Sequence, residues 1–121
     1  MNSKILVVDD EKKLVDFIRQ YLESRNYEVS VAYSGKEALA TAKKTRPDII
    51  ILDIMMSGMD GLEVLRRIKE DPETNSAKVI MLTAKTETGT MFEAEKMLAT
   101  DYIIKPFGLE KLKEVIDKYI I

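Results

Sequence analysis

The feature that most restricts the possible folds of this chain is a short apolar run that ends in one carboxylate. Residues 49–52 read Ile-Ile-Ile-Leu, Asp53 follows, and small or turn-forming residues continue to Gly61. A strand that is apolar on both faces is typical of the middle of a parallel sheet with helices on each side. Ligands of such sheets lie outside the carboxyl ends of the strands, so Asp53 is expected at the mouth of a site. Taken alone, the residue would be interpreted as a solvated aspartate.

The rest of the chain alternates short apolar runs with stretches of helical periodicity. Further strands are expected at 4–8, 28–32, 79–82 and 102–104, the second of them at the sheet edge because it alternates polar and apolar residues. Helices are expected at 14–24, 34–46, 60–70, about 90–98 and 109–120. This alternation predicts an α/β, flavodoxin-like fold: a doubly wound sheet of five parallel strands in the order 2-1-3-4-5, with five helices.

The composition is that of a single globular domain spanning residues 1–121. Net charge is −2 with both signs interspersed, which suggests neither direct nucleic-acid binding by this segment nor a membrane surface. Cysteine and histidine are absent, which excludes disulfides, thiol chemistry and a phosphohistidine on this chain. The apolar run after Met1 is too short for a signal peptide or a membrane span, so a cytoplasmic location is expected.

Acidic groups and a cation should gather at the carboxyl edge of the expected sheet. The strand order reverses between the first and third strands, where Asp9, Asp10 and Asp53 would meet, and the last two strands would add Thr83 and Lys105. Two unit charges about 4 Å apart repel by roughly 4 kcal/mol at an effective dielectric near 20. One lysine cannot offset three such repulsions. Either one carboxylate takes up a proton through a raised pKa, or a hard cation occupies the site.

The same groups suit a phosphoryl ligand. Ligation by oxygen alone selects Mg²⁺ or a similar ion such as Mn²⁺, which welcomes phosphate oxygens. Lys105 could pair with one phosphoryl oxygen, Thr83 could donate to a second, and the metal could bridge a third. No Ser–His or Cys–His pair is available, so the expected nucleophile is a carboxylate, and Asp53 is central among these groups.

These motifs resemble the receiver domain of two-component response regulators, of the chemotaxis-receiver type, over essentially the whole chain. The matching residues are Asp9-Asp10, Asp53 within Ile-Leu-Asp-Ile-Met-Met-x-Gly-Met-Asp-Gly, Thr83-Ala84 and Lys105-Pro106-Phe107. The intervals between the motifs fit as well. The resemblance implies a phosphorelay protein that takes a phosphoryl group onto Asp53 from a histidine kinase or a phosphotransfer protein. It also implies a protein that catalyses only its own phosphorylation and dephosphorylation and is otherwise no enzyme.

The resemblance assigns the metal ligands. It implies that Asp10, Asp53 and the backbone carbonyl of Met55 bind Mg²⁺, with Asp9 helping directly or through water. Asp9 and Asp10 also have a simpler interpretation, because an aspartate just ahead of a helix often caps it. A pair of aspartates immediately after a buried strand favours ligation.

The resemblance also assigns the phosphate contacts and a switch. Thr83 and Lys105 would contact the phosphoryl oxygens. Tyr102 matches an aromatic position that swings inward when the threonine moves toward the phosphate, although a half-buried tyrosine in a strand can equally be a packing residue. The Lys105-Pro106 peptide bond matches one that is cis in the family, which is uncommon even before proline.

Signalling is implied to run through the surface of the fourth helix, fifth strand and fifth helix, which would contact a downstream effector domain or protein and could support a homodimer. The chain departs from the family pattern in the loop after Asp53 and at the end of the expected fourth helix. Ser57 stands where a proline usually follows the Asp53 turn, and Leu98-Ala99-Thr100-Asp101 replaces a more usual Gly-Ala-Asp-Asp.

Other function classes fit only parts of the pattern. An aspartyl-phosphate phosphatase resembling haloacid dehalogenases would place an acid two residues after the nucleophile, where this chain has Met55. A phosphorylation-independent interaction module would need the fold alone, and the complete set of acidic, threonine and lysine residues argues against it. A Rossmann-type nucleotide site would need a glycine-rich turn after the first strand, where Asp-Asp-Glu-Lys-Lys stands instead.

Overall fold

Parallel strands form one sheet in the order β2-β1-β3-β4-β5, which confirms the predicted topology. The structure, a computed structural model, describes residues 3–56, 58–84 and 99–120. Its strands are β1 (Lys4–Val8), β2 (Glu28–Ala32), β3 (Ile49–Asp53), β4 (Lys78–Ala84) and β5 (Asp101–Lys105). Its helices are α1 (Lys12–Ser24), α2 (Gly35–Thr45), α3 (Gly61–Glu70) and α5 (Leu109–Tyr119). The expected fourth helix at about 90–98, and Ser57, lie outside the described residues.

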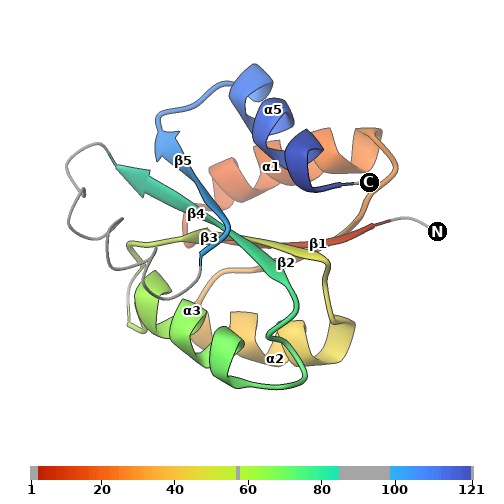
Figure 1. Cartoon of the computed structure of the whole chain (residues 1–121). Coiled ribbons are helices and arrows are strands. Elements are labelled where there is room, and N and C mark those ends of the chain that lie inside the picture. Colours follow the sequence, from red (N-terminus) through yellow and green to blue (C-terminus); the bar gives the residue numbers. More distant parts are fainter. Residues whose placement is uncertain (1–2, 57, 85–98, 121) are drawn as a thin grey trace.

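The helices cover both faces of the sheet (Figure 1), with α1 and α5 on one face and α2 and α3 on the other. Because side chains alternate along a strand, β3 divides its apolar residues between two separate cores. Ile49 and Ile51 pack with the α1 and α5 side chains, whereas Ile50 and Leu52 pack with those of α2 and α3. This double coverage explains why the central run has no polar side. In the described ranges, no helix is long and apolar enough to cross a membrane.

Two strands are longer than predicted, and the difference matters for the site. The ladder between β4 and β5 continues through Thr83↔Ile104 to Ala84↔Lys105. Thr83 and Lys105 therefore belong to strands instead of the loops after them. Their backbone positions are fixed by the hydrogen bonds of the sheet, which a loop residue would lack.

Side-chain caps start two of the helices where the sequence predicts them. The hydroxyl of Ser34 accepts a hydrogen bond from the Glu37 amide at 3.2 Å, at the start of α2. The carboxylate of Asp60 accepts one from the Glu63 amide at 2.9 Å, at the start of α3. Each cap satisfies one of the amides that the first turn of a helix leaves unpaired. Both helices consequently begin at a defined residue.

The packing leads to a test of which apolar side chains stabilise the fold. Leu65 of α3 is fully buried, whereas Leu109 of α5 is 43% exposed. We expect Leu65→Ala to lower the free energy of unfolding by about 2–5 kcal/mol, because it leaves a cavity, and Leu109→Ala to lower it by less than about 1 kcal/mol. Urea denaturation followed by circular dichroism measures both. Equal losses in the two variants would contradict the assigned core.

Candidate functional site

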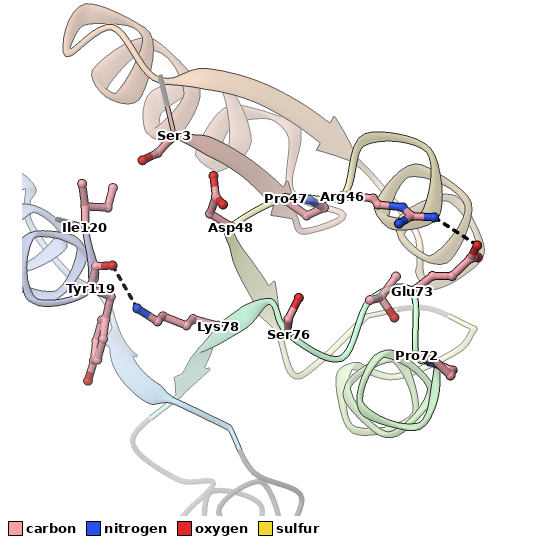
Figure 2. Close-up of a pocket in the computed structure, with 11 residues that line it drawn as sticks. Ser3, Arg46, Pro47, Asp48, Pro72, Glu73, Ser76, Lys78, Tyr119 and Ile120 are labelled. Atoms are coloured by element: carbon pink, nitrogen blue, oxygen red, sulfur yellow. Dashed lines mark hydrogen bonds and ion pairs between the residues drawn. The ribbon is translucent and has the colours of Figure 1, made fainter. Parts of the chain in front are cut away.

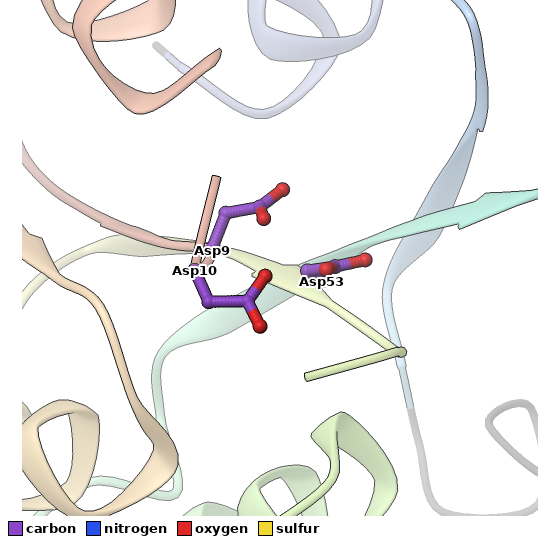
Figure 3. A group of neighbouring side chains, drawn as sticks. All are labelled: Asp9, Asp10 and Asp53. Carbon is purple, nitrogen blue, oxygen red and sulfur yellow. The ribbon is translucent and has the colours of Figure 1, made fainter. Parts of the chain in front are cut away.

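Three carboxyl groups meet at the carboxyl ends of β1 and β3 (Figure 3). One oxygen from each of Asp9, Asp10 and Asp53 lies within 4.8 Å of the other two. The pairing of Val8 with Leu52 in adjacent strands brings the following residues, Asp9 and Asp53, to the same edge. Asp9 and Asp53 are buried, while Asp10 is exposed and leaves one side of the group open to solvent.

Lys105 supplies the positive charge next to the two buried carboxylates. Its Nζ lies 3.0 Å from Asp9 Oδ2 and 3.2 Å from Asp53 Oδ1. Since β4 separates β5 from β3, the long side chain spans a strand to reach them. Burial lowers the pKa of Lys105, but the hydrogen bond to Asp9 and the charge of Asp53 outweigh it, so the pKa lies above its ordinary value. The lysine is therefore charged at neutral pH.

Burial and a neighbouring negative charge disfavour the ionised form of the Asp53 carboxyl group. Burial first, and then repulsion from Asp9, raise its pKa from 3.8 to about 7, although the Lys105 ammonium and the Met55 amide oppose the change. The Met55 amide lies 3.4 Å from Asp53 Oδ1. One lysine thus offsets only part of the repulsion, as the sequence suggests. Both a proton and a cation remain ways to relieve the rest.

Asp9 has a second contact, which bears on whether it caps a helix. Its Oδ1 accepts a hydrogen bond from the amide of Glu11 at 3.0 Å. Glu11 is the residue that precedes α1, so this bond orders the turn between β1 and α1 and lies ahead of the helical amides. One oxygen of Asp9 thus orders the turn, and the other faces Lys105.

Thr83 and Tyr102 lie on the same side of the sheet, in neighbouring strands. Thr83 is buried, and its hydroxyl donates to the carbonyl of Ala84 at 3.3 Å. Tyr102 packs against the core that the sheet forms with α2 and α3, and its buried hydroxyl has no hydrogen-bond partner among the described residues. The structure therefore gives Tyr102 an inward packing position beside the strand that carries Thr83.

The loops around the site show one confirmed feature and one residue that the sequence reasoning missed. The Lys105-Pro106 peptide bond is cis, as the family resemblance implies. Met55 is 64% exposed at the rim of the site. The missed residue is Gly61, whose amide donates to the carbonyl of Ile54 at 2.8 Å and closes the loop after Asp53. Its sequence signals are its place as the last residue of the Asp53 motif and its position directly after the capping Asp60, where better helix formers are available.

A cavity of about 420 Å³ opens at the opposite end of the sheet (Figure 2). Its charged side chains already contact one another or the backbone. Arg46 pairs with Glu73 at 3.1 Å, and Lys78 Nζ donates to the Tyr119 carbonyl at 3.3 Å. These contacts pair the charged groups internally, whereas the acidic group beside Lys105 retains excess charge. The acidic group is therefore the better candidate for a functional site.

The raised pKa of Asp53 has a consequence for stability in the absence of metal. The folded protein binds the carboxyl proton more tightly than the unfolded chain does, so the group destabilises the fold as pH rises from about 4 through about 7. We expect metal-free Asp53→Asn to be more stable than the parent at about pH 8 by a few kcal/mol, since one pKa unit is about 1.4 kcal/mol.

That difference should vanish below about pH 4, where the carboxyl is neutral in both states. Urea denaturation across this pH range, with a chelator present, measures it. A variant that is no more stable than the parent at about pH 8 would contradict the electrostatic account of the site.

Comparison with known proteins agrees with this arrangement. The family model "Response regulator receiver domain" matches residues 5–117. The transcriptional regulatory protein ResD of Bacillus subtilis is 45% identical over 106 residues, covering 88% of this chain and 43% of that protein. The sporulation initiation phosphotransferase F of the same species is 33% identical over 120 residues, covering 99% of this chain and 95% of that protein.

Solved structures give the same answer. The chemotaxis protein CheY4 of Vibrio cholerae superposes with a TM-score of 0.93 at 32% identity, covering 99% of this chain and 100% of that one. The chain spans less than half the length of several relatives, among them ResD at 43% and the response regulator PleD of Caulobacter vibrioides at 28%. With the predicted topology, the clustered aspartates and these matches in hand, the chain belongs to the receiver-domain family of two-component response regulators.

Proposed function

We propose that this receiver domain, spanning residues 1–121, is a phosphorelay switch that accepts a phosphoryl group on Asp53 from a histidine kinase or a phosphotransfer protein. The observation that carries the proposal is the buried Asp53 carboxylate, which lies 3.2 Å from Lys105 Nζ and has an oxygen within 4.8 Å of carboxylate oxygens of Asp9 and Asp10. A phosphodonor must be able to reach the Asp53 carboxylate, and the exposed Asp10 side of the group leaves a path for it. We further propose that the protein works in the cytoplasm.

Mg²⁺, with Mn²⁺ as a substitute, is the proposed cofactor. The donor set fits it, because the clustered side chains offer only oxygen atoms and carry a charge that Lys105 does not balance. Asp10, Asp53 and the backbone carbonyl of Met55 would hold the ion, with Asp9 directly or through water. When bound, the ion neutralises negative charge on the carboxylates and on the oxygens of the phosphoryl group.

The residues of the chain divide the transfer between them. A carboxylate oxygen of Asp53 attacks the donor phosphorus, an O–P bond forms and the P–N bond to the donor imidazole breaks. The imidazole leaves with the electron pair and takes a proton from solvent. Lys105 pairs with one phosphoryl oxygen, and the Thr83 hydroxyl donates to another. Attack by water on the phosphorus later releases inorganic phosphate and restores the carboxylate, so the chain acts only on itself.

Thr83 and Tyr102 are the proposed switch. They face the same side of the sheet from adjacent strands, and the Tyr102 hydroxyl has no partner within the described part of the chain. A threonine drawn toward the phosphoryl group would change the space beside the tyrosine and shift an existing equilibrium. The signal would leave through β5, α5 and the segment 90–98, which lies outside the described residues. An effector domain or protein, or a second copy in a homodimer, would contact that surface.

The nucleophile can be tested with a small phosphodonor. We expect Asp53→Asn to abolish labelling by acetyl phosphate and Mg²⁺, because the amide cannot form the acyl phosphate. Asp48→Asn is the matched control, since Asp48 stands just before the other end of β3, where its Oδ2 accepts from the Lys4 amide at 2.8 Å. Mass spectrometry of the intact protein measures labelling. Undiminished labelling of Asp53→Asn would remove Asp53 from the role, whereas a parent protein that takes up no label would favour a phosphorylation-independent module.

The metal site can be tested separately. We expect Asp10→Asn to weaken Mg²⁺ binding about tenfold to a hundredfold, because it removes one carboxylate charge close to the ion. Asp10 is exposed, so the fold should survive the substitution. Asp16→Asn is the control, since Asp16 lies on α1 and pairs with Arg19 at 3.2 Å. Isothermal titration calorimetry measures the affinity, and an unchanged value for Asp10→Asn would contradict the proposed ligand set.

A further inference from the structure

The first turn of α3 rests directly on the peptide that joins Asp53 to Ile54. A Cβ built on Gly61 would lie 2.2 Å from the Asp53 carbonyl oxygen and 2.7 Å from the Ile54 Cα. Both distances are shorter than real Cβ contacts, and both partners are backbone atoms that no rotamer change can move. The Gly61 amide also donates to the Ile54 carbonyl at 2.8 Å. The helix can therefore approach the end of β3 this closely only because residue 61 has no side chain.

The same peptide is held from its other side by the sheet. The amide of Ile54 donates to the Leu82 carbonyl of β4 at 3.0 Å, one step beyond the last paired residue of β3. The backbone on the carboxyl side of Asp53 is thus fixed between β4 and the first residue of α3. The Cα–Cβ direction of Asp53 follows from that backbone, and with it the place of the carboxylate beside Lys105.

The other described glycines have different surroundings. A Cβ on Gly35 would meet the side chains of Met59 and Val64 at 2.9 Å, and a Cβ on Gly108 would meet no described atom within 4 Å. Gly58 has a φ of +81°, so its backbone conformation is what requires glycine there. Among these residues, Gly61 is the one that contacts the backbone of Asp53.

We propose that Gly61 is a positioning residue for the phosphoacceptor, and this rests on the proposed function of Asp53. Helix propensity gives no reason for a glycine here, since in a helix interior it favours alanine over glycine by about 1 kcal/mol. The glycine lets the start of α3 pack closely against the Asp53–Ile54 peptide, and this packing orients the Asp53 side chain toward the other carboxylates and Lys105. A Cβ would have to push the peptide or the helix away by ~1 Å, and a misplacement of that size at a reacting group can lower a rate about a hundredfold.

The test compares alanine substitutions at three glycines in the whole chain. We expect Gly61→Ala to reduce both the affinity for Mg²⁺ and the initial rate of labelling by acetyl phosphate at least about tenfold. Gly35→Ala should destabilise the fold through side-chain crowding while changing the rate less than about threefold, and Gly108→Ala should change neither quantity. Rates are compared at a temperature where circular dichroism shows each variant folded. A folded Gly61→Ala with parental rate and affinity would overturn the proposal.

A second set of variants answers if Gly61→Ala does not fold. Asp60→Ala removes the cap of α3 and should loosen the packing of its first turn on the Asp53–Ile54 peptide without introducing a clash. Asp60→Asn removes the same charge but can still cap the helix. Ser34→Ala removes the equivalent cap of α2. We expect only Asp60→Ala to lower the labelling rate severalfold. Equal rates for Asp60→Ala and Ser34→Ala would overturn the proposal.

Labelling of the parent protein distinguishes failure of the proposed function from failure of the role of Gly61. If the parent takes up no phosphoryl group, or if Asp53→Asn is labelled as well as the parent, then the proposed function fails and the role of Gly61 fails with it. If the parent is labelled on Asp53 and folded Gly61→Ala is labelled equally fast, then only the role of Gly61 fails. The contact would in that case serve the stability of α3 alone.

Discussion

The mutual repulsion of two buried carboxylates is the constraint on which the site depends. Asp9 and Asp53 are brought together and buried by the pairing of β1 with β3, so that water screens their charges poorly, and Lys105 is the cation that makes their burial tolerable. The compensation is incomplete, since the pKa of Asp53 still rises to about 7. A cluster in this state carries excess negative charge, and this charge is the reason for proposing a divalent cation as its ligand.

Burial of apolar side chains on both faces of the sheet offsets the unfavourable electrostatic energy of the site. The alternating residues of β3 enter two cores, and four described helices cover them. The site itself is assembled from the ends of four strands or the residues just beyond them, so its geometry follows from strand register more than from loop conformation. Rigid strands with a reactive edge are a common way for an α/β sheet to carry a function.

Much of this could be predicted from the order of residues, because the relevant signals are local. The apolar run before Asp53 predicts a central strand, and the caps at Ser34 and Asp60 predict where helices begin. Three features could not be predicted in this way: the extension of β4 and β5 to include Thr83 and Lys105, the size of the Asp53 pKa shift, and the contact of Gly61 with the Asp53 backbone. The strand extension and the pKa shift depend on segments that are far apart in the chain, and the Gly61 contact depends on how closely the loop after Asp53 folds back on β3.

Because the Lys105 side chain reaches across β4, its ion pairs with Asp9 and Asp53 help to hold the end of β5 in place. β5 is the last strand of the described sheet, bordered by a single neighbour, and the ammonium ties its end to residues two and three strands away. Any cation that binds Asp9 and Asp53 weakens their ion pairs with Lys105. Amide protons of the outer strand should consequently exchange with solvent at rates that report, from a distance, how the acidic group is neutralised.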